Sequence, residues 1–209
     1  MRPEELLNVY DDTGVVIGAR PRREAKASGL AVGAVNVLLV NGRGDVLLQR
    51  RPGDKENGDR WDKSVGGHVS AGEGFDTTAV REAAEELFDD PRSPRVHLAR
   101  DASEFASLAG SLDLAEHVLF RRVAMQHNLR DVRFAPGGGL RNVVYHLAIY
   151  LGRTEIPLTG FSPQVAEIAA LEYRSAAEVD ALLLHGELAP NMAFLWLSQA
   201  RPLLALVGR

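Results

Sequence analysis

Three glutamates near the middle of the chain, Glu82, Glu85 and Glu86, have the spacing needed to bind a metal ion. On an α-helix these positions are i, i+3 and i+4, so their carboxylates project from one face. Like charges at this spacing destabilise a helix slightly, and a hard divalent cation that prefers oxygen ligands removes this cost. The sequence therefore indicates a site for Mg²⁺ or Mn²⁺, with a solvated acidic helix face as the alternative.

The residues on either side support a loop followed by a helix. Asp76 can cap a helix that runs to about Phe88. Its apolar stripe consists of Val80, Ala83, Ala84 and Leu87. Arg81 lies beside the glutamates, and we expect it to pair with Glu73 in the preceding loop and so hold that loop against the helix.

Six residues of this segment match a known motif in register: Gly67, Glu73, Arg81, Glu82, Glu85 and Glu86. The Nudix box reads G-x5-E-x7-R-E-U-x-E-E-x-G-U, where U is a bulky aliphatic residue, and residues 67–89 resemble it. Ala83 is smaller than the usual aliphatic residue. Phe88 and Asp89 replace the last glycine and the last aliphatic residue of the motif. The loss of the glycine leaves the end of the helix undecided. Asp89 could extend the acidic face of the helix.

The resemblance implies an α/β fold, the Nudix-type αβα sandwich with a mixed β-sheet and a loop-helix-loop metal site. It also implies a Mg²⁺- or Mn²⁺-dependent hydrolase that cleaves a diphosphate bond in a nucleoside diphosphate linked to another moiety. Carried over by position, Glu82 and Glu86 would be metal ligands, and the Gly67 carbonyl a further one. Glu85 would be a ligand or the general base, and the choice of base stays open.

A second resemblance, to the type 1 isopentenyl-diphosphate isomerase branch, rests on residues 47–51, Lys55, Trp61, 64–68 and 72–73. It implies that Arg51 and Lys55 bind the diphosphate, and His68 lies where it could contact substrate.

That isomerase has a catalytic Cys where this chain has Gly66, and takes His ligands from the strand equivalent to 30–40. This chain has no Cys, and 30–40 contains no His. Proton transfer on both faces of an alkene needs an acid and a base, so hydrolysis is favoured. A divergent isomerase-like enzyme and a non-catalytic nucleotide-sensing module remain alternatives.

Two further groups of charged residues lie outside the box. Glu116 and Glu167 are candidates for an additional metal-binding carboxylate, and the sequence does not choose between them. A basic region could contact a nucleotide phosphate, although ordinary surface charge is the favoured interpretation. It comprises Arg121, Arg122, Arg130, Arg133 and Arg141.

The composition sets outer limits on function. The chain has 209 residues, 45% of them hydrophobic, and a net charge of −4, which excludes wholesale disorder and argues against a nucleic-acid polymer as partner. The absence of Cys excludes disulfides and thiolate metal sites. The first residues lack the apolar run of a secretory signal, and no apolar stretch approaches bilayer length. We expect a cytoplasmic protein with a small-molecule diphosphate substrate and no membrane partner.

Strand and helix patterns alternate along the chain, which predicts a mixed sheet flanked by helices. We expect a hairpin at 5–10 and 15–19, strands at 30–40, 46–49, 95–99, 116–125, 142–151 and 168–173, and helices at 22–28, 76–88, 175–184 and from about 191. We interpret 1–209 as a single domain: an N-terminal extension at 1–29, a core at 30–185 and a C-terminal helix at 186–209. The last helix is apolar almost all round, which suits a core helix or a homodimer interface.

Overall fold

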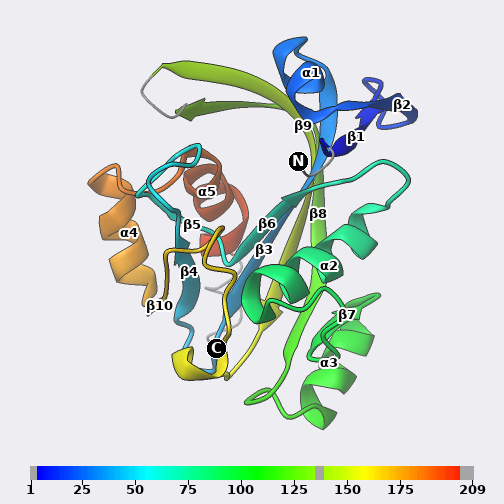
Figure 1. Ribbon diagram of the computed structural model, residues 1–209. Coiled ribbons are helices and arrows are strands. Elements are labelled where there is room, and N and C mark those ends of the chain that lie inside the picture. The colour runs from blue at the N-terminus through cyan, green and yellow to red at the C-terminus, as the bar shows by residue number, and fades with distance from the viewer. Residues whose placement is uncertain (1–3, 135–138, 203–209) are drawn as a thin grey trace.

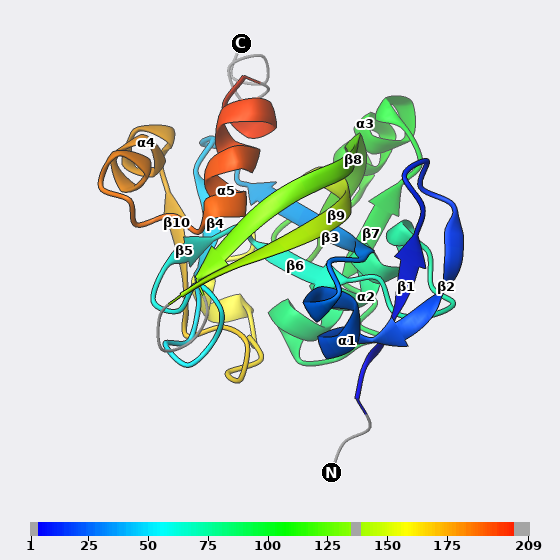
Figure 2. The same cartoon turned by 90° about the horizontal axis from the view of Figure 1, so that it is seen from above.

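A strongly curved sheet with helices on both faces organises the molecule, as the computed structural model shows for residues 4–134 and 139–202 (Figures 1 and 2). The main strand order is β10-β4-β3-β9-β8-β7, and β1, β2, β5 and β6 are attached to this path. The strands are β1 (Leu6–Tyr10), β2 (Val16–Pro21), β3 (Ala31–Val40), β4 (Val46–Arg50), β5 (Trp61–Asp62), β6 (Val65–His68), β7 (Val96–Ala99), β8 (Val118–Phe134), β9 (Leu140–Arg153) and β10 (Ala170–Arg174).

The helices divide between the two faces of the sheet. They are α1 (Arg22–Ala27), α2 (Phe75–Phe88), α3 (Ala102–Ser111), α4 (Ala176–Leu184) and α5 (Pro190–Leu195), with a 3₁₀ turn at Leu158–Gly160 and a π-helical turn at Trp196–Ala200. Side chains of β3 alternate between the faces: Val35 and Val37 join the core under α2, whereas Leu38 joins the core under α4 and α5. This is the αβα layering expected from the sequence.

The central strand β3 has three antiparallel neighbours along one edge, β1 at its first residues and then β6 and β4. It pairs with β6 over Ala34–Val37 and with β4 only at Leu39 and Val40, while β9 runs parallel to it on the other edge. The strands β4 and β6 therefore separate from one another, because each takes a different part of the same edge. We call this opening the fork, and side chains from α2 reach into it.

Most of the predicted elements are present. The exceptions are that β8 and β9 extend to Phe134 and from Leu140, well beyond the predicted 116–125 and 142–151, and that α3, β5 and β6 were not predicted. No residue of α3 is fully buried, and its short apolar stripe, Phe105, Leu108 and Ala109, is only partly buried. The strand β6 contains two glycines, and its strand conformation depends on pairing with β3.

Both ends of α2 differ from expectation. Gly74, not Asp76, is the N-cap, and the Asp76 carboxylate instead accepts a 2.7 Å hydrogen bond from the Tyr150 hydroxyl. At the other end Asp89 takes the left-handed conformation (φ 51°) that a glycine usually supplies. Asp89 is exposed and caps the helix, so the suggested extension of the acidic face to this residue is wrong.

The predicted apolar C-terminal helix is buried in the core of this chain. Met192, Leu195 and Trp196 are fully buried, whereas Leu197 is exposed. None of the helices in the described part of the chain combines the length and the apolar character needed to cross a bilayer.

Candidate functional site

A cavity of about 230 Å³ opens at the fork and collects charged residues from both halves of the chain. We call it the site cavity. Its lining consists of Glu5, Arg22, Ala34, Val35, Asn36, Arg51, Lys63, Gly66, Gly67, His68, Arg81, Glu82, Glu85, Glu86, Arg133, Gln164 and Glu167. The three glutamates of α2 thus share one cavity, as their helical spacing predicts; we call them the carboxylate face.

Glu86 is the most deeply placed of the three carboxylates. It is 7% exposed and accepts hydrogen bonds from Gln49 Nε2 on β4 (3.3 Å) and the Gly66 amide on β6 (3.2 Å). Burial, reinforced by repulsion from Glu82, raises its pKa well above the ordinary value. Glu86 therefore joins the two arms of the fork.

Glu82 lies directly against the backbone of β6. A Cβ atom built on Gly67 would overlap the Glu82 carboxylate, which explains why this position of the motif needs a glycine. Burial raises the pKa of Glu82 to about 7, although Arg81 contacts it at 3.1 Å and works in the opposite direction. Two adjacent, desolvated carboxylates fit a site that accepts a cation.

Arg81 connects several glutamates of this segment. Its guanidinium binds Glu73 through Nε and Nη2, both at 3.0 Å, and Glu85 through Nη1 at 3.0 Å. Glu73 also accepts a 2.8 Å bond from the Thr78 hydroxyl. The expected Arg81–Glu73 pair is present and ties the loop to α2. Burial disfavours the charged form of Arg81, but its carboxylate partners outweigh burial and raise its pKa.

The donor set suits a hard divalent cation, because the acidic side of the cavity offers only oxygen ligands. The Gln49 Oε1 atom, next to Glu86, is buried without a hydrogen-bond partner among the described residues. In the described ranges, no three histidine or acidic side chains already surround a common point, since Arg81 draws two of the glutamates toward itself. The residues fit a metal ion whose binding would rearrange the Arg81 contacts.

Facing the carboxylate face is a group of cations that we call the cation wall: Arg22, Arg51, Lys63 and Arg133. Lys63 is only 5% exposed, and its Nζ atom lies 3.1 Å from Asp62 and 3.3 Å from Asn191 of α5. Arg51 also contacts Asp62, at 3.3 Å. Of these four residues only Arg51 was predicted as a substrate-binding residue.

His68 lies between these two sides and is buried. Its Nε2 atom is 3.3 Å from the Tyr145 hydroxyl. Burial lowers the pKa of His68 well below its usual value, and the nearby cations Arg22 and Lys26 lower it further. The imidazole is therefore neutral at physiological pH, suited to hydrogen bonding with a ligand.

Of the other residues singled out from the sequence, some line the cavity and others do not. Lys55 does not line it, and instead binds Glu167, which does, at 2.8 Å. Glu116 is not among the residues that line the cavity and contacts Arg95 instead, so of the two candidate carboxylates Glu167 is the one at the cavity. Within the predicted basic region, Arg133 lines the cavity, whereas Arg122 contacts Asp76 at 3.6 Å.

Comparison with known proteins matches residues 30–120 to the NUDIX domain, a segment that contains both arms of the fork and the whole of α2. This segment is similar to a Nudix domain, and the match covers less than half of the chain. The matched segment supplies the carboxylate face, Arg51, Lys63 and His68, while Arg22, Arg133 and Glu167 lie outside it.

Relatives of this segment include two uncharacterized Nudix hydrolases. One, from a Nostoc species, is 36% identical over 89 residues, which is 42% of this chain and 53% of the relative. The other, from Streptomyces coelicolor, is 39% identical over 85 residues, covering 40% and 47%. The chain spans about half the length of the curated relatives it matches.

Similarity of fold extends further than similarity of sequence. The crystal structure of DR0079 from Deinococcus radiodurans is similar with a TM-score of 0.62 over 91% of this chain and 96% of that one, at 22% identity. This supports the Nudix-type αβα fold for nearly the whole chain. It carries no information on which substrate is bound.

Several cavity residues had no signal in the sequence. Asn36 is 2% exposed, and its Nδ2 donor lacks a hydrogen-bond partner in the described part of the chain. Lys63 lies in loop sequence and has the pattern of an ordinary polar position, and Gln49, which contacts Glu86 beside the cavity, belonged only to the segment 47–51 of the isomerase resemblance. Only the pairing of β3 with β4 and β6 brings them to the carboxylates.

Proposed function

We propose that this protein is a Mg²⁺-dependent Nudix hydrolase, with Mn²⁺ as an alternative ion, that cleaves a diphosphate bond in a nucleoside diphosphate linked to another moiety. One observation carries the proposal: three carboxylates and the backbone of Gly67 face a wall of cations across one cavity. A metal-bound diphosphate needs oxygen ligands on one side and positively charged donors on the other. The cavity supplies both.

The residues then take distinct roles. Glu82, Glu86 and the Gly67 carbonyl hold the metal, and Glu85 either joins them or accepts the proton of the attacking water. Bound Mg²⁺ supplies charge neutralisation at the phosphate and lowers the pKa of water. In hydrolysis the water oxygen forms a bond to one phosphorus, the bridging P–O bond breaks, and the bridging oxygen leaves with the other phosphate. Arg81 and Glu73 are positioning residues, because they reach the carboxylate face through ion pairs.

On the opposite side, Arg51 and His68 contact the diphosphate directly in this proposal. Lys55 acts through Glu167, which it holds at the cavity edge. We further propose that residues 1–209 work as one domain, because Arg22 from the N-terminal extension completes the lining of the site cavity.

Alkene isomerisation is not proposed. At Gly66, the position of the isomerase cysteine, an added Cβ atom would overlap the side chain of Lys63. A thiol therefore cannot be placed there without moving Lys63, whose Nζ atom is held by Asp62 and Asn191. The resemblance to the isomerase branch stays a proposal about ancestry.

A turnover screen tests the proposed function. The full chain would be incubated with Mg²⁺ and pooled nucleoside diphosphate sugars, dinucleotides, nucleoside triphosphates and isopentenyl diphosphate, and the products resolved by ion-pair chromatography. We expect metal-dependent cleavage of a diphosphate, reduced at least about 10²-fold in Glu86→Gln. The matched control is Glu104→Gln, which changes an exposed-face carboxylate of α3 outside the cavity.

Two results would contradict the proposal. Isomerised isopentenyl diphosphate would assign the chain to the isomerase-like alternative. Tight nucleotide binding without turnover of any compound would assign it to a nucleotide-sensing module.

A further inference from the structure

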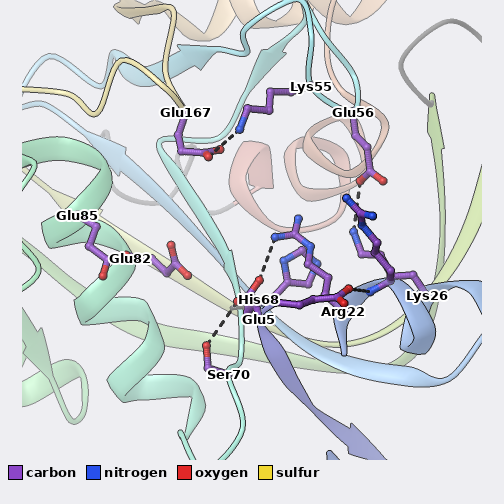
Figure 3. A network of polar contacts seen from close by, with 12 residues as sticks. Glu5, Arg22, Lys26, Lys55, Glu56, His68, Ser70, Glu82, Glu85 and Glu167 are labelled. Carbon is purple, nitrogen blue, oxygen red and sulfur yellow. Dashed lines mark hydrogen bonds and ion pairs between the residues drawn. The ribbon is translucent and has the colours of Figure 1, made fainter. Parts of the chain in front are cut away.

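A second, larger cavity adjoins the site cavity on the side of the cation wall. It has a volume of about 840 Å³, in the range of small-molecule binding sites. We call it the outer cavity. It is lined by Glu4, Arg22, Arg23, Lys26, Ala27, Glu56, Asn142 and Val143. Arg22 lines both cavities, and Figure 3 shows it between Glu82 and the Lys26–Glu56 pair.

The cations of the outer cavity share few carboxylates. Lys26 and Arg133 both contact the same Glu56 oxygen, at 3.3 and 3.5 Å, and the side chains of both cations are 10% exposed. Arg22 is paired with Glu5 at 3.0 Å. The Arg23 guanidinium is exposed and makes no ion pair with any described residue. Arg133 lines the site cavity only. The described lining of the outer cavity itself holds three cations, Arg22, Arg23 and Lys26, against two carboxylates, Glu4 and Glu56.

The electrostatics of Lys26 agree with that excess. Burial lowers its pKa to about 8, and repulsion by Arg133 and Arg22 contributes to the shift, so the attraction of Glu56 does not compensate. An additional anion beside Lys26 would reverse this shift. Lys26 contacts none of the residues assigned to the metal.

The chemistry of the lining also limits what can bind. The described lining residues include no aromatic side chain, so a nucleobase would find no aromatic ring to stack on here. Arginine and lysine donors are instead suited to phosphate and carboxylate groups. The nearest part of a substrate held in the site cavity would be the group attached to its diphosphate.

Resting on the proposed function, we infer that the outer cavity is a subsite for a second anionic group, a phosphate monoester or a carboxylate, carried by the moiety beyond the scissile diphosphate. Arg23 and Lys26 bind this group, and Arg22 spans the two subsites. The preferred substrate is then a diphosphate with an additional anion several bonds away. The N-terminal extension, through α1, selects it.

Two matched substrate pairs test the inference. NADP⁺ and NAD⁺ differ by a phosphate monoester, and UDP-glucuronate and UDP-glucose differ by a carboxylate, so the pairs distinguish the two sources of charge. Turnover with Mg²⁺ would be measured as kcat/KM. Binding of the same four compounds would be measured by calorimetry in EDTA, where metal-dependent turnover does not occur.

We expect the wild type to prefer the anionic member of one pair by about tenfold, the effect of one charge-assisted hydrogen bond at a partly exposed site. Arg23→Ala and Lys26→Met should reduce this preference toward equality and leave the turnover of the member without the additional anion within about twofold. Arg23→Ala removes an exposed side chain, so it remains informative if Lys26→Met folds poorly. Arg20→Ala is the control, because Arg20 pairs with Glu24 and lines neither cavity.

Equal handling of both members of both pairs by the wild type would overturn the inference. So would a preference that survives both Arg23→Ala and Lys26→Met. If nothing is hydrolysed but calorimetry shows the anionic preference and its loss, the proposed function fails while the anion subsite stands. If compounds are hydrolysed without preference, the subsite fails and the hydrolase stands.

Discussion

The carboxylate face and the cation wall line the same cavity but are built in opposite ways. Glu82, Glu85 and Glu86 come from little more than one turn of α2, and helical geometry alone places them together. The cation wall takes Arg22 from α1, Arg51 and Lys63 from either side of β5, and Arg133 from the end of β8. One side of the site is local in sequence, whereas the other exists only after the chain has folded.

The two regions also differ in how their charges are balanced. A single cation, Arg81, contacts two glutamates of the carboxylate face, Glu82 and Glu85, and also Glu73 in the preceding loop. On the cation wall each cation contacts a carboxylate: Asp62 for Lys63 and Arg51, Asp131 for Arg133 at 3.0 Å, and Glu5 for Arg22 at 3.0 Å. The carboxylate face therefore has fewer cations than carboxylates, whereas every cation of the cation wall has a carboxylate partner. The following changes, from the largest expected effect to the smallest, test that difference.

Asp62→Asn should destabilise the protein most. Asp62 is 1% exposed and contacts both Lys63 and Arg51, so the change leaves two cations near a neutral amide. We expect the free energy of unfolding in urea to fall by about 3–5 kcal/mol. Glu24→Gln, which breaks the exposed pair with Arg20, should cost less than about 0.5 kcal/mol. Equal losses for the two variants would show that Asp62 does not support the cation wall.

Gly67→Ala should impair the carboxylate face without a comparable loss of stability. The added Cβ displaces the Glu82 carboxylate from the backbone of β6, and we expect kcat/KM to fall by about 10²-fold, a loss of roughly 2.7 kcal/mol. Gly110→Ala is the control, since a Cβ there meets no atom within 4 Å. Unchanged kinetics in Gly67→Ala would mean that Glu82 can move without consequence and is not a metal ligand.

Glu167→Gln should lower kcat/KM by about tenfold through loss of a carboxylate at the cavity edge. Glu116→Gln should leave it unchanged, because Glu116 lies outside the cavity beside Arg95. Mg²⁺ titration of the rate would show whether the effect is on metal affinity. The reverse ranking of the two variants would be incompatible with the assignment of Glu167 to the site.

The stability of the protein should depend on pH through Lys26. Its pKa is lowered to about 8 in the folded protein from 10.5, so between these values the unfolded chain binds more protons and stability rises with pH. The difference in free energy of unfolding between the wild type and Lys26→Met should therefore shift in favour of the wild type, by on the order of 1 kcal/mol, from pH 7.5 to 10. Urea denaturation at these two pH values measures it. A constant difference would show that burial does not depress this pKa.

Much of the fold could be predicted because it depends on local pattern. Alternating apolar residues predict β3, and the period of Val80, Ala83, Ala84 and Leu87 predicts α2. The errors occur where local pattern and tertiary contact diverge: α3 has no fully buried residue, and β8 and β9 extend each other by pairing up to Phe134 and Leu140. The N-cap of α2 was misassigned because the Asp76 carboxylate accepts a hydrogen bond from Tyr150, a residue 74 positions away.

The sequence by itself determined the acidic half of the site. A helix repeats every 3.6 residues whatever surrounds it, so the spacing of the three glutamates was sufficient to place them on one face. The Arg81–Glu73 pair followed from the same short segment and is present.

Only the tertiary structure decided the basic half. Separate segments reach the cavity because β3 pairs with β4 and β6 at different points and because α1 begins and β8 ends beside the same opening. Those pairings are non-local, and no spacing in the sequence encodes them. Tertiary contacts also place Glu167 at the cavity and Glu116 away from it. They bring Lys26 and Arg133 to the same carboxylate, that of Glu56, because buried charges are positioned by partners that are far away along the chain.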